Sequence, residues 1–216
     1  MRPAVPAEAP RDCPLCPRLV AFRAANAASE PSWFNGAVPS FGDPQARLIV
    51  VGLAPGLRGA NRTGRPFTGD YAGELLYETL LDFGFARGSY AATPDDGLEL
   101  VDCLITNAVR CVPPENKPTP AEIGTCRPFL VSRLAASEGA RAIMALGRIA
   151  HDSTLAAFEA RKAAFPFAHG AQHKVREPFV LFDSFHCSRY NTNTGRLTRQ
   201  MFRDVFAAIR AHLDGK

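Results

Sequence analysis

The sequence predicts one α/β domain with a parallel sheet covered by helices on both faces, preceded by a cysteine-bearing N-terminal extension. Three observations carry this prediction. Short β-branched apolar runs alternate with longer segments of helical character, as in parallel sheets with helical crossovers. The apolar runs are continuous, as expected for strands buried on both faces. The chain has 216 residues, of which 46% are hydrophobic, and can bury one sizeable core.

Four strands are expected in order along the chain, with a helix after each of the first three. Residues 46–53 (ARLIVVGL) form an apolar run that ends in glycine and proline, which is typical of a buried strand. Similar runs predict three further strands, at 101–107, 140–146 and 179–183. The helices follow a glycine-rich loop, a proline-rich loop and the third strand, and are expected at 71–83, 121–136 and 149–158.

A helix is also expected toward each end of the chain. The proline-rich N-terminal arm is not expected to form regular structure until its cysteines are bound, and a short helix over 17–28 follows it. In the last helix, apolar residues recur at the spacing of a core face: Leu197, Met201, Val205, Ile209 and Leu213. We therefore expect a single domain over 1–216, in which 1–28 is the extension.

Composition argues against several classes of protein. No run approaches the roughly 20 apolar residues of a membrane-spanning helix, and the N-terminus lacks the apolar region of a secretory signal. We therefore expect a cytosolic chain. The formal net charge of +4 is too small to indicate a nucleic-acid partner by itself. Most of the 25 basic residues are nevertheless arginine, whose planar guanidinium suits phosphate.

Six cysteines in a chain expected in a reducing compartment indicate metal binding or catalysis rather than disulfides. Cys13 and Cys16 have the two-residue spacing that lets two thiolates bind one metal centre. Cys111 and Cys126, separated by a stiff proline-rich loop, can complete a set of four ligands. Spacing alone leaves a four-cysteine zinc site and an iron–sulfur cluster equally open.

Two cysteines and two histidines are not expected to bind metal. Cys103 stands within an apolar run and is expected to be a small core residue. Cys187 follows a histidine in a polar loop and has no assigned role. His169 and His173 have a four-residue spacing, but Gly170 weakens the helix that would bring them together, so we expect structural or solvent-exposed side chains.

Polar and glycine residues follow three of the four expected strands, and the ligands of a parallel sheet bind beyond these carboxyl ends. The first such loop covers 52–70, and its glycines let backbone N–H groups approach an anion closely. It matches neither a Walker A loop nor a dinucleotide fingerprint. The second begins at Asn107, whose amide can read the edge of a base. The third begins at His186, among residue types that bind phosphate.

Together these motifs resemble the uracil-DNA glycosylase superfamily, and within it the iron–sulfur-containing family 5, or type B, enzymes. The resemblance rests on GLAPG at 52–56, NRTGRPFTGD at 61–70, ITNAVRC with PPENKPTP across 105–120, and HCSRYNTNTGRLT at 186–198. It implies a three-layer α/β/α sandwich around a four-stranded parallel sheet. It also implies a structural [4Fe–4S] cluster on the four paired cysteines: Cys13, Cys16, Cys111 and Cys126.

The activity implied by this resemblance is excision of uracil, and of other deaminated bases such as hypoxanthine, from DNA. Phe67 would stack on the flipped base and Asn107 would read its edge. His186 would hydrogen-bond the base oxygen where negative charge develops, and Asp70 would activate water or stabilise the cationic sugar. The backbone of Gly52, Leu53 and Ala54 would line the base pocket.

The resemblance further implies contacts to the DNA strand, in which the stretch containing Tyr190 could insert into the helix where the base has left. The implied DNA-binding residues are Gly56, Arg58, Arg62, Arg65, Ser188, Arg189, Tyr190, Asn191 and Arg196.

Two positions depart from the family pattern. Type A enzymes have an acidic residue where this chain has Leu53, followed by Ala54, so the water would be handled by Asp70. A less polar pocket also fits a broader range of substrates. Cys187 stands where proline is usual, which affects the rigidity of the histidine loop rather than His186 itself.

Two functions are therefore compared. The first is a monomeric DNA-repair glycosylase whose partner is DNA containing a deaminated base, with no membrane partner. The alternative is a non-catalytic nucleic-acid-binding module ordered by zinc. Bound iron and labile sulfide would distinguish the first from the second.

Overall fold

The computed structural model describes residues 5–215 and has the expected α/β architecture. Its main sheet contains six strands in the order β1-β5-β2-β6-β8-β7. The four central strands are mutually parallel and match the four predicted ones. In chain order they are β2 (Leu48–Gly52), β5 (Cys103–Asn107), β6 (Ala142–Leu146) and β8 (Phe179–Ser184).

Two antiparallel edge strands extend the sheet beyond the four predicted parallel strands. β1 (Phe41–Gly42) pairs with β5, and β7 (Gln172–Arg176) pairs with β8. β1 is too short to form an apolar run, and β7 alternates between exposed and half-buried residues. A separate ribbon is formed by β3 (Ala86–Arg87) and β4 (Glu99–Leu100).

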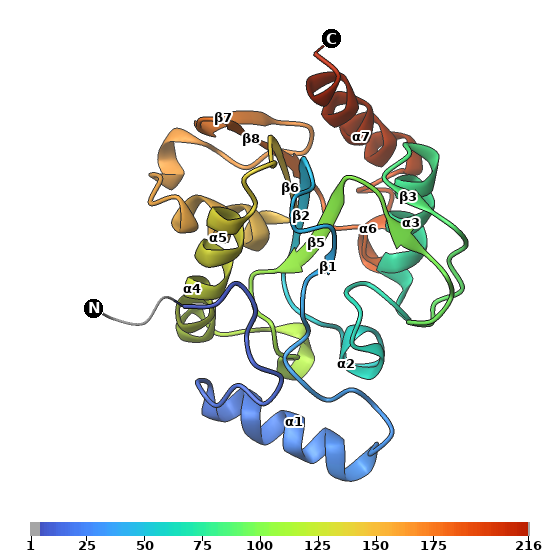
Figure 1. Cartoon of the computed structure of the whole chain (residues 1–216), viewed down its shortest axis with the longest axis vertical. Coiled ribbons are helices and arrows are strands. Elements are labelled where there is room, and N and C mark those ends of the chain that lie inside the picture. The colour runs from blue at the N-terminus through green and yellow to red at the C-terminus, as the bar shows by residue number, and fades with distance from the viewer. Residues whose placement is uncertain (1–4, 216) are drawn as a thin grey trace.

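Helices cover both faces of the sheet and make the expected three-layer sandwich (Figure 1). α4 (Pro120–Ala136) and α5 (Arg148–Ala157) lie on one face, while α3 (Tyr71–Asp82) and α7 (Arg199–Leu213) lie on the other. The strand residues alternate between two cores: Val50 packs in the core with α3 and α7, and Val51 in the core with α4 and α5.

Shorter elements surround this sandwich. α1 (Pro17–Ser29) corresponds to the helix predicted over 17–28 and lies beyond one end of the sheet (Figure 1). The remaining helices are α2 (Ala60–Thr63), α6 (Arg189–Asn193), η1 (Pro114–Asn116) and η2 (Lys162–Ala164). Residues 1–4 of the predicted extension lie outside the described residues. None of the helices in the described chain is long and apolar enough to cross a membrane.

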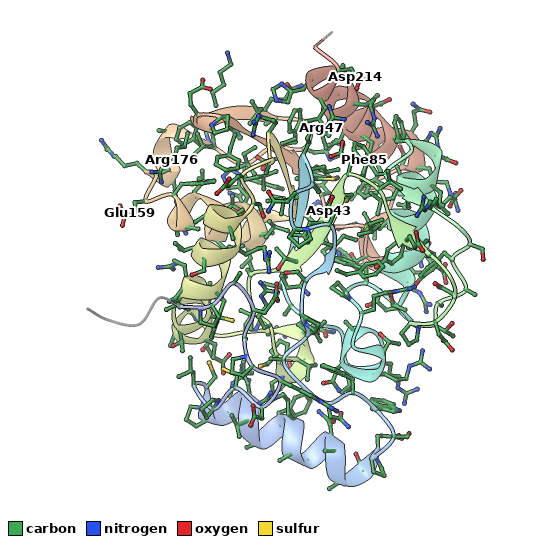
Figure 2. All side chains as sticks on the ribbon, viewed as in Figure 1. Asp43, Arg47, Phe85, Glu159, Arg176 and Asp214 are labelled. Atoms are coloured by element: carbon green, nitrogen blue, oxygen red, sulfur yellow. The ribbon has the colours of Figure 1, made fainter. Side chains whose placement is uncertain are left out.

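Side chains sort between core and surface as their chemistry requires. Figure 2 shows Glu159 at the outer edge of the molecule, whereas Phe85 lies inside and has no exposed surface. Cys103 is also fully buried, which confirms the expected core position.

Polar caps fix where the site-bearing helices begin. The Asp70 side chain accepts the Gly73 N–H and starts α3, and the Ser188 side chain accepts the Asn191 N–H and starts α6. α4 begins with a capping box in which Thr119 and Glu122 bond to each other's backbone. Loop residues at the strand ends are therefore held by the helices that follow them.

Arg65 is buried and does not support the predicted contact to DNA. Its guanidinium makes two hydrogen bonds of 2.8 Å with the Asp96 carboxylate, and both side chains are almost fully enclosed. The rings of Phe41, Tyr77 and Tyr90 lie within 6 Å of the guanidinium carbon. Arg65 therefore anchors the 61–70 loop to the domain rather than to phosphate.

Breaking this buried pair should destabilise the fold. We expect Asp96→Asn to lower the free energy of unfolding by about 3–5 kcal/mol at pH 7, because it leaves the buried Arg65 charge without its partner. The exposed Arg87–Glu99 pair provides a matched control, and Glu99→Gln should cost less than about 1 kcal/mol. Urea unfolding measures both.

The stability contributed by the Arg65–Asp96 pair should also depend on pH. Hydrogen bonds from Arg65 hold the pKa of Asp96 well below its ordinary value of 3.8. A lowered carboxyl pKa contributes stability that is complete at neutral pH and is lost as the pH falls below that ordinary value toward the folded-state pKa. The gap between wild type and Asp96→Asn should therefore persist from pH 8 to about pH 4 and shrink only in stronger acid. Equal stability of the two proteins at pH 7 would contradict this assignment.

Candidate active site

One open cavity of about 600 Å³ lies at the carboxyl ends of the central strands. Parallel pairing places Gly52, the last residue of β2, beside Asn107, the last residue of β5. The loop after β8 brings His186 to the same cavity. Ten of the predicted catalytic, base-binding and DNA-binding residues line it: Leu53, Ala54, Gly56, Arg58, Phe67, Asp70, Asn107, His186, Ser188 and Arg189.

A glycine at position 52 permits the close packing at the floor of the cavity. A Cβ atom there would lie 2.3 Å from Asn107 Oδ1 and 2.7 Å from the Phe67 ring. Phe67 itself has a left-handed backbone, with φ of 54°. Asn107 Oδ1 is buried and has no hydrogen-bond partner among residues 5–215. An unsatisfied buried acceptor is costly unless a ligand or water supplies a donor.

The His186 ring lines the cavity close to Phe67, with 6.0 Å between ring centroids. Its Nδ1 atom is buried and has no hydrogen-bond partner within the described chain. Enclosure by the protein lowers the pKa of His186 to about 4, because burial disfavours the charged ring. The backbone carbonyl of His186 accepts a 2.8 Å hydrogen bond from the Asn191 amide. The site therefore contains a neutral imidazole whose backbone is fixed by the Asn191 side chain.

Asp70 contributes a carboxyl group to the same cavity, at the N-cap of α3. Its Oδ1 atom accepts the Gly73 N–H at 3.2 Å. Its Oδ2 atom lies against the glycine-rich loop, where a Cβ on Gly59 would be only 2.4 Å away. Burial raises the pKa of Asp70, and the hydrogen bonds from the Gly73 and Ala72 backbone oppose that rise.

The predicted DNA-binding residues separate into several groups in the structure. Arg58 and Arg189 are exposed at the cavity. Arg62 lines a different surface hollow, and the Arg196 guanidinium lies 4.7 Å from the Phe185 ring. Tyr190 is 71% exposed beside the cavity rather than within it.

Asn116 lines the cavity, although it was not predicted as a site residue. It comes from η1 in the proline-rich loop, where Glu115 and Asn116 are successive left-handed residues with φ of 54° and 57°. Asparagine tolerates this conformation well, so the Glu-Asn pair between prolines is the signal that could have indicated a sharp turn here.

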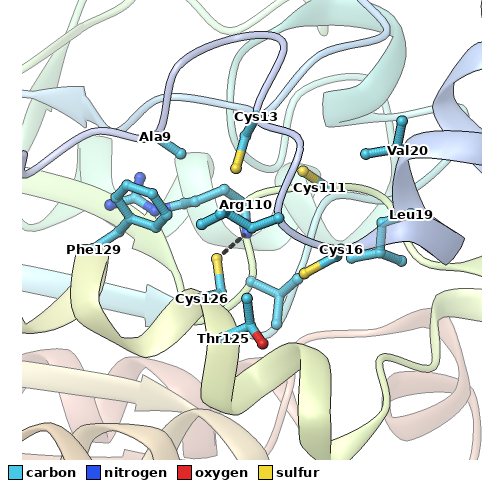
Figure 3. A pocket seen from close by; sticks show the side chains of 12 residues that line it. Ala9, Cys13, Cys16, Leu19, Val20, Arg110, Cys111, Thr125, Cys126 and Phe129 are labelled. Atoms are coloured by element: carbon cyan, nitrogen blue, oxygen red, sulfur yellow. Dashed lines mark hydrogen bonds between the residues drawn. The ribbon is translucent and has the colours of Figure 1, made fainter. Parts of the chain in front are cut away.

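The four paired cysteines line a second, small apolar cavity beneath α1 and α4 (Figure 3). Figure 3 shows their sulfur atoms pointing into a common space. The Arg110 N–H donates to Cys126 Sγ at 3.3 Å. Burial raises the pKa of Cys111 to about 12 and that of Cys126 to about 11, so these thiols are protonated unless a cation binds them.

Another group of side chains that could bind a metal ion consists of His151, His173 and Asp183, and Asp183 hydrogen-bonds to both histidines. The Asp183 carboxylate contacts His151 Nδ1 at 2.7 Å and His173 Nε2 at 3.1 Å. His169 also has internal partners, in Phe185 and Met201. His169 and His173 therefore both hydrogen-bond to other groups of the protein. Cys187 is buried, and its thiol donates to the Ala72 carbonyl at 3.3 Å.

Comparison with known proteins gives a consistent result. The sequence profile of the uracil DNA glycosylase superfamily matches residues 39–210. A type-5 uracil-DNA glycosylase of Thermus thermophilus is 47% identical over 199 residues, covering 89% of this chain and 90% of that protein. The type-5 enzyme of Pyrobaculum aerophilum is 39% identical, covering 93% and 88%. A type-4 enzyme of the same organism is 37% identical over 53% of this chain and 51% of its own length.

The environment of His186 leads to a titration prediction. The carbon and nitrogen NMR signals of this ring should titrate with a midpoint near pH 4. Because the unfolded chain binds this proton near pH 6.5 and the folded chain only near pH 4, the free energy of unfolding should fall as the pH drops from 6.5 to 4. His186→Gln should lack that part of the acid sensitivity. A midpoint near 6.5 in the folded protein would contradict the neutral ring.

Proposed function

This chain belongs to the uracil DNA glycosylase superfamily, and we propose that it excises uracil from DNA by hydrolysing the bond between the base and its deoxyribose. One observation carries the proposal for this site: Asn107 Oδ1 and His186 Nδ1 are both buried and unpaired where Phe67 and Asp70 meet them in one cavity. These groups match the needs of a flipped pyrimidine, which presents a polar edge, an apolar face and a bond that must be attacked by water.

The uracil base is recognised by Asn107 and Phe67. The Asn107 amide accepts the base N3–H through Oδ1 and donates to the O4 carbonyl through Nδ2. The Phe67 ring packs against the face of the base. The absence of a side chain at Gly52 lets both groups pack against the end of β2, since any Cβ there would clash with them.

His186 stabilises the leaving base. As the glycosidic bond breaks, its electron pair moves to the base and negative charge grows on the O2 carbonyl. A neutral imidazole N–H donates to this oxygen without a prior proton gain, and preorganised donors of this kind often supply the largest part of catalysis. The lowered pKa of His186 supports this role, because it keeps the ring neutral at physiological pH.

Asp70 activates the attacking water molecule. Its carboxylate accepts a proton from the water molecule whose oxygen forms the new bond to C1′. The base anion takes a proton from solvent as it leaves, and Asp70 then returns its proton to solvent. The negative charge of Asp70 also stabilises the oxocarbenium-like sugar. Leu53 and Ala54, which line the same cavity, offer no side-chain group for the water, so this work falls to Asp70. The apolar residues Leu53 and Ala54 in this pocket also support excision of hypoxanthine.

The DNA strand crosses the rim of the cavity. Arg58 and Arg189 are exposed there and are placed to bind phosphates, with the Gly56 backbone and the Ser188 hydroxyl. Arg62 donates to the Arg58 carbonyl and so lies next to this rim, whereas Arg196 lies over the Phe185 ring. The Asn191 side chain donates to the His186 carbonyl and supports the histidine loop. The exposed Tyr190 ring is the wedge that fills the space left by the flipped base. A monomer in the cytoplasm is the expected form of the enzyme.

The second cavity is proposed to hold a [4Fe–4S] cluster on Cys13, Cys16, Cys111 and Cys126. The donor set consists only of thiols, which is the preference of iron–sulfur clusters. A four-cysteine zinc site would use the same thiols. Membership of the uracil DNA glycosylase superfamily favours the enzyme over the zinc-ordered binding module.

A cluster in this position would be structural. It would join the N-terminal segment before α1 to the backbone around Cys111 and to α4, which Cys126 belongs to. Metal binding of this kind adds its binding free energy to folding.

The proposed reaction is tested by base release from DNA that contains uracil, with inosine-containing DNA as a second substrate. In this assay Asp70→Asn should lower the single-turnover rate about 10²-fold or more, because it removes the base that accepts the water proton. Asparagine caps helices as well as aspartate does, so α3 should keep its start. DNA affinity should stay within about threefold, because the lost interaction belongs to the transition state.

Glu74→Gln is the matched control for Asp70→Asn. Glu74 is an exposed carboxylate on the same helix, and its charge acts on Asp70 only at a distance. This variant should excise uracil at the wild-type rate at pH 7. Equal losses of rate and DNA affinity in Asp70→Asn would contradict the proposed role, and no base release by the metal-replete wild type would contradict the proposed function.

The cluster is tested by metal analysis of anaerobically purified protein. We expect a brown protein with about four iron and four sulfide per chain. Cys126→Ser should lose most of the iron and unfold at a lower temperature. Cys103→Ala, which alters a fully buried cysteine of the sheet core, should keep its iron. Stoichiometric zinc in place of iron and sulfide would overturn the proposal.

A further inference from the structure

His169 bridges two elements directly behind the histidine loop. Its Nδ1 atom accepts the backbone N–H of Phe185 at 3.1 Å, and Phe185 immediately precedes His186. Its Nε2 atom lies 3.3 Å from the Met201 carbonyl of α7. The ring also stacks on Phe185, with 5.0 Å between centroids. One side chain thus ties the residue before His186 to the last helix.

This contact continues the sheet ladder past the end of β8. The Asp183 N–H donates to the Ala171 carbonyl, and the Gly170 N–H donates to the Asp183 carbonyl. Next along the strand, the Phe185 N–H meets the His169 imidazole instead of a backbone carbonyl. The strand that leads into His186 is therefore held at its final position by a titratable group.

The two partners specify one protonation state. The Met201 carbonyl can only accept, so His169 Nε2 must carry the proton. The Phe185 N–H can only donate, so His169 Nδ1 must be unprotonated. The neutral Nε2–H tautomer satisfies both bonds, whereas an imidazolium would point a second N–H at the Phe185 N–H.

Charged groups around His169 act on its neutral state. Asp204 on α7 is the carboxylate whose charge acts on His169, and it favours the protonated ring. Arg196 lies over the Phe185 ring at 4.7 Å and disfavours a second cation beside it. The Asp183 carboxylate of β8 is already bonded to His151 and His173. Burial lowers the pKa of the half-buried His169, which keeps the ring neutral at physiological pH.

We infer that His169 is a positioning residue for uracil excision, whose neutral imidazole holds the Phe185 backbone so that His186 meets the base oxygen. This inference rests on the proposed function of His186. When His169 is protonated, the Phe185 N–H loses its acceptor and His186 is less well positioned. Excision should therefore weaken in acid before His186 itself titrates.

Two substitutions separate the two nitrogens of His169. In His169→Asn, the side-chain oxygen can take the place of Nδ1 and accept the Phe185 N–H without titrating. In His169→Gln, the longer side chain carries its amide to the Met201 carbonyl and away from the Phe185 N–H. Single-turnover excision of uracil is measured from pH 5 to 8 for both variants and wild type, together with DNA affinity and thermal unfolding.

We expect His169→Gln to excise uracil on the order of tenfold more slowly at pH 8, with DNA affinity unchanged. His169→Asn should keep a rate near wild type at pH 8 and should lose less of it in acid. The midpoint of the acid loss that distinguishes wild type from His169→Asn should equal the pKa of His169 measured by NMR, and that NMR should show the Nε2–H tautomer at pH 8.

The results separate this inference from the proposed function. If wild type releases no uracil at pH 8, the proposed function fails. If wild type is active and all three proteins share one pH profile and one rate, the positioning role of His169 is wrong. Lower melting temperatures of both variants with unchanged rates and profiles would also overturn it, because they would show a purely structural contact.

Discussion

The parallel pairing of β2 with β5 is the constraint on which both proposed functional regions depend. It places Gly52 beside Asn107, and it continues beyond the strands through hydrogen bonds from Ala108 N–H to the Gly52 carbonyl and from Val109 N–H to the Leu53 carbonyl. Cys111 follows on the same stretch of backbone. The floor of the proposed base pocket and one proposed cluster ligand therefore lie on one continuous stretch of paired backbone.

The groups around this ladder are held by equally rigid contacts. Asp70 is fixed as the cap of α3, and that helix approaches the preceding loop so closely that a Cβ on Gly73 would lie 1.7 Å from the Phe67 carbonyl. Arg65 anchors the same loop through Asp96. Positioning of this kind is what electrostatic catalysis requires, since donors and charges must already be in place when charge develops on the base.

Much of the fold was predictable from local pattern. The four central strands are buried on both faces and so appear as continuous apolar runs, and their carboxyl ends bring residues 52, 107 and 186 together in any parallel sheet. β1 and β7 were missed because edge strands carry no such run. Asn116 was missed because its place at the cavity depends on how the proline-rich loop turns.

The amino-acid pattern alone specified the α/β class, the set of strand-end loops and the two cysteine pairs, because periodicity and short spacings are local properties. The three-dimensional fold assigned the arginines and histidines. Arg65 pairs with Asp96, far along the chain, while Arg58 remains exposed at the cavity. His169 bonds to Phe185, whereas His186 Nδ1 has no hydrogen-bond partner in the described part of the chain. Burial and pairing depend on residues distant in sequence, so the same residue type acquires its role only in the folded chain.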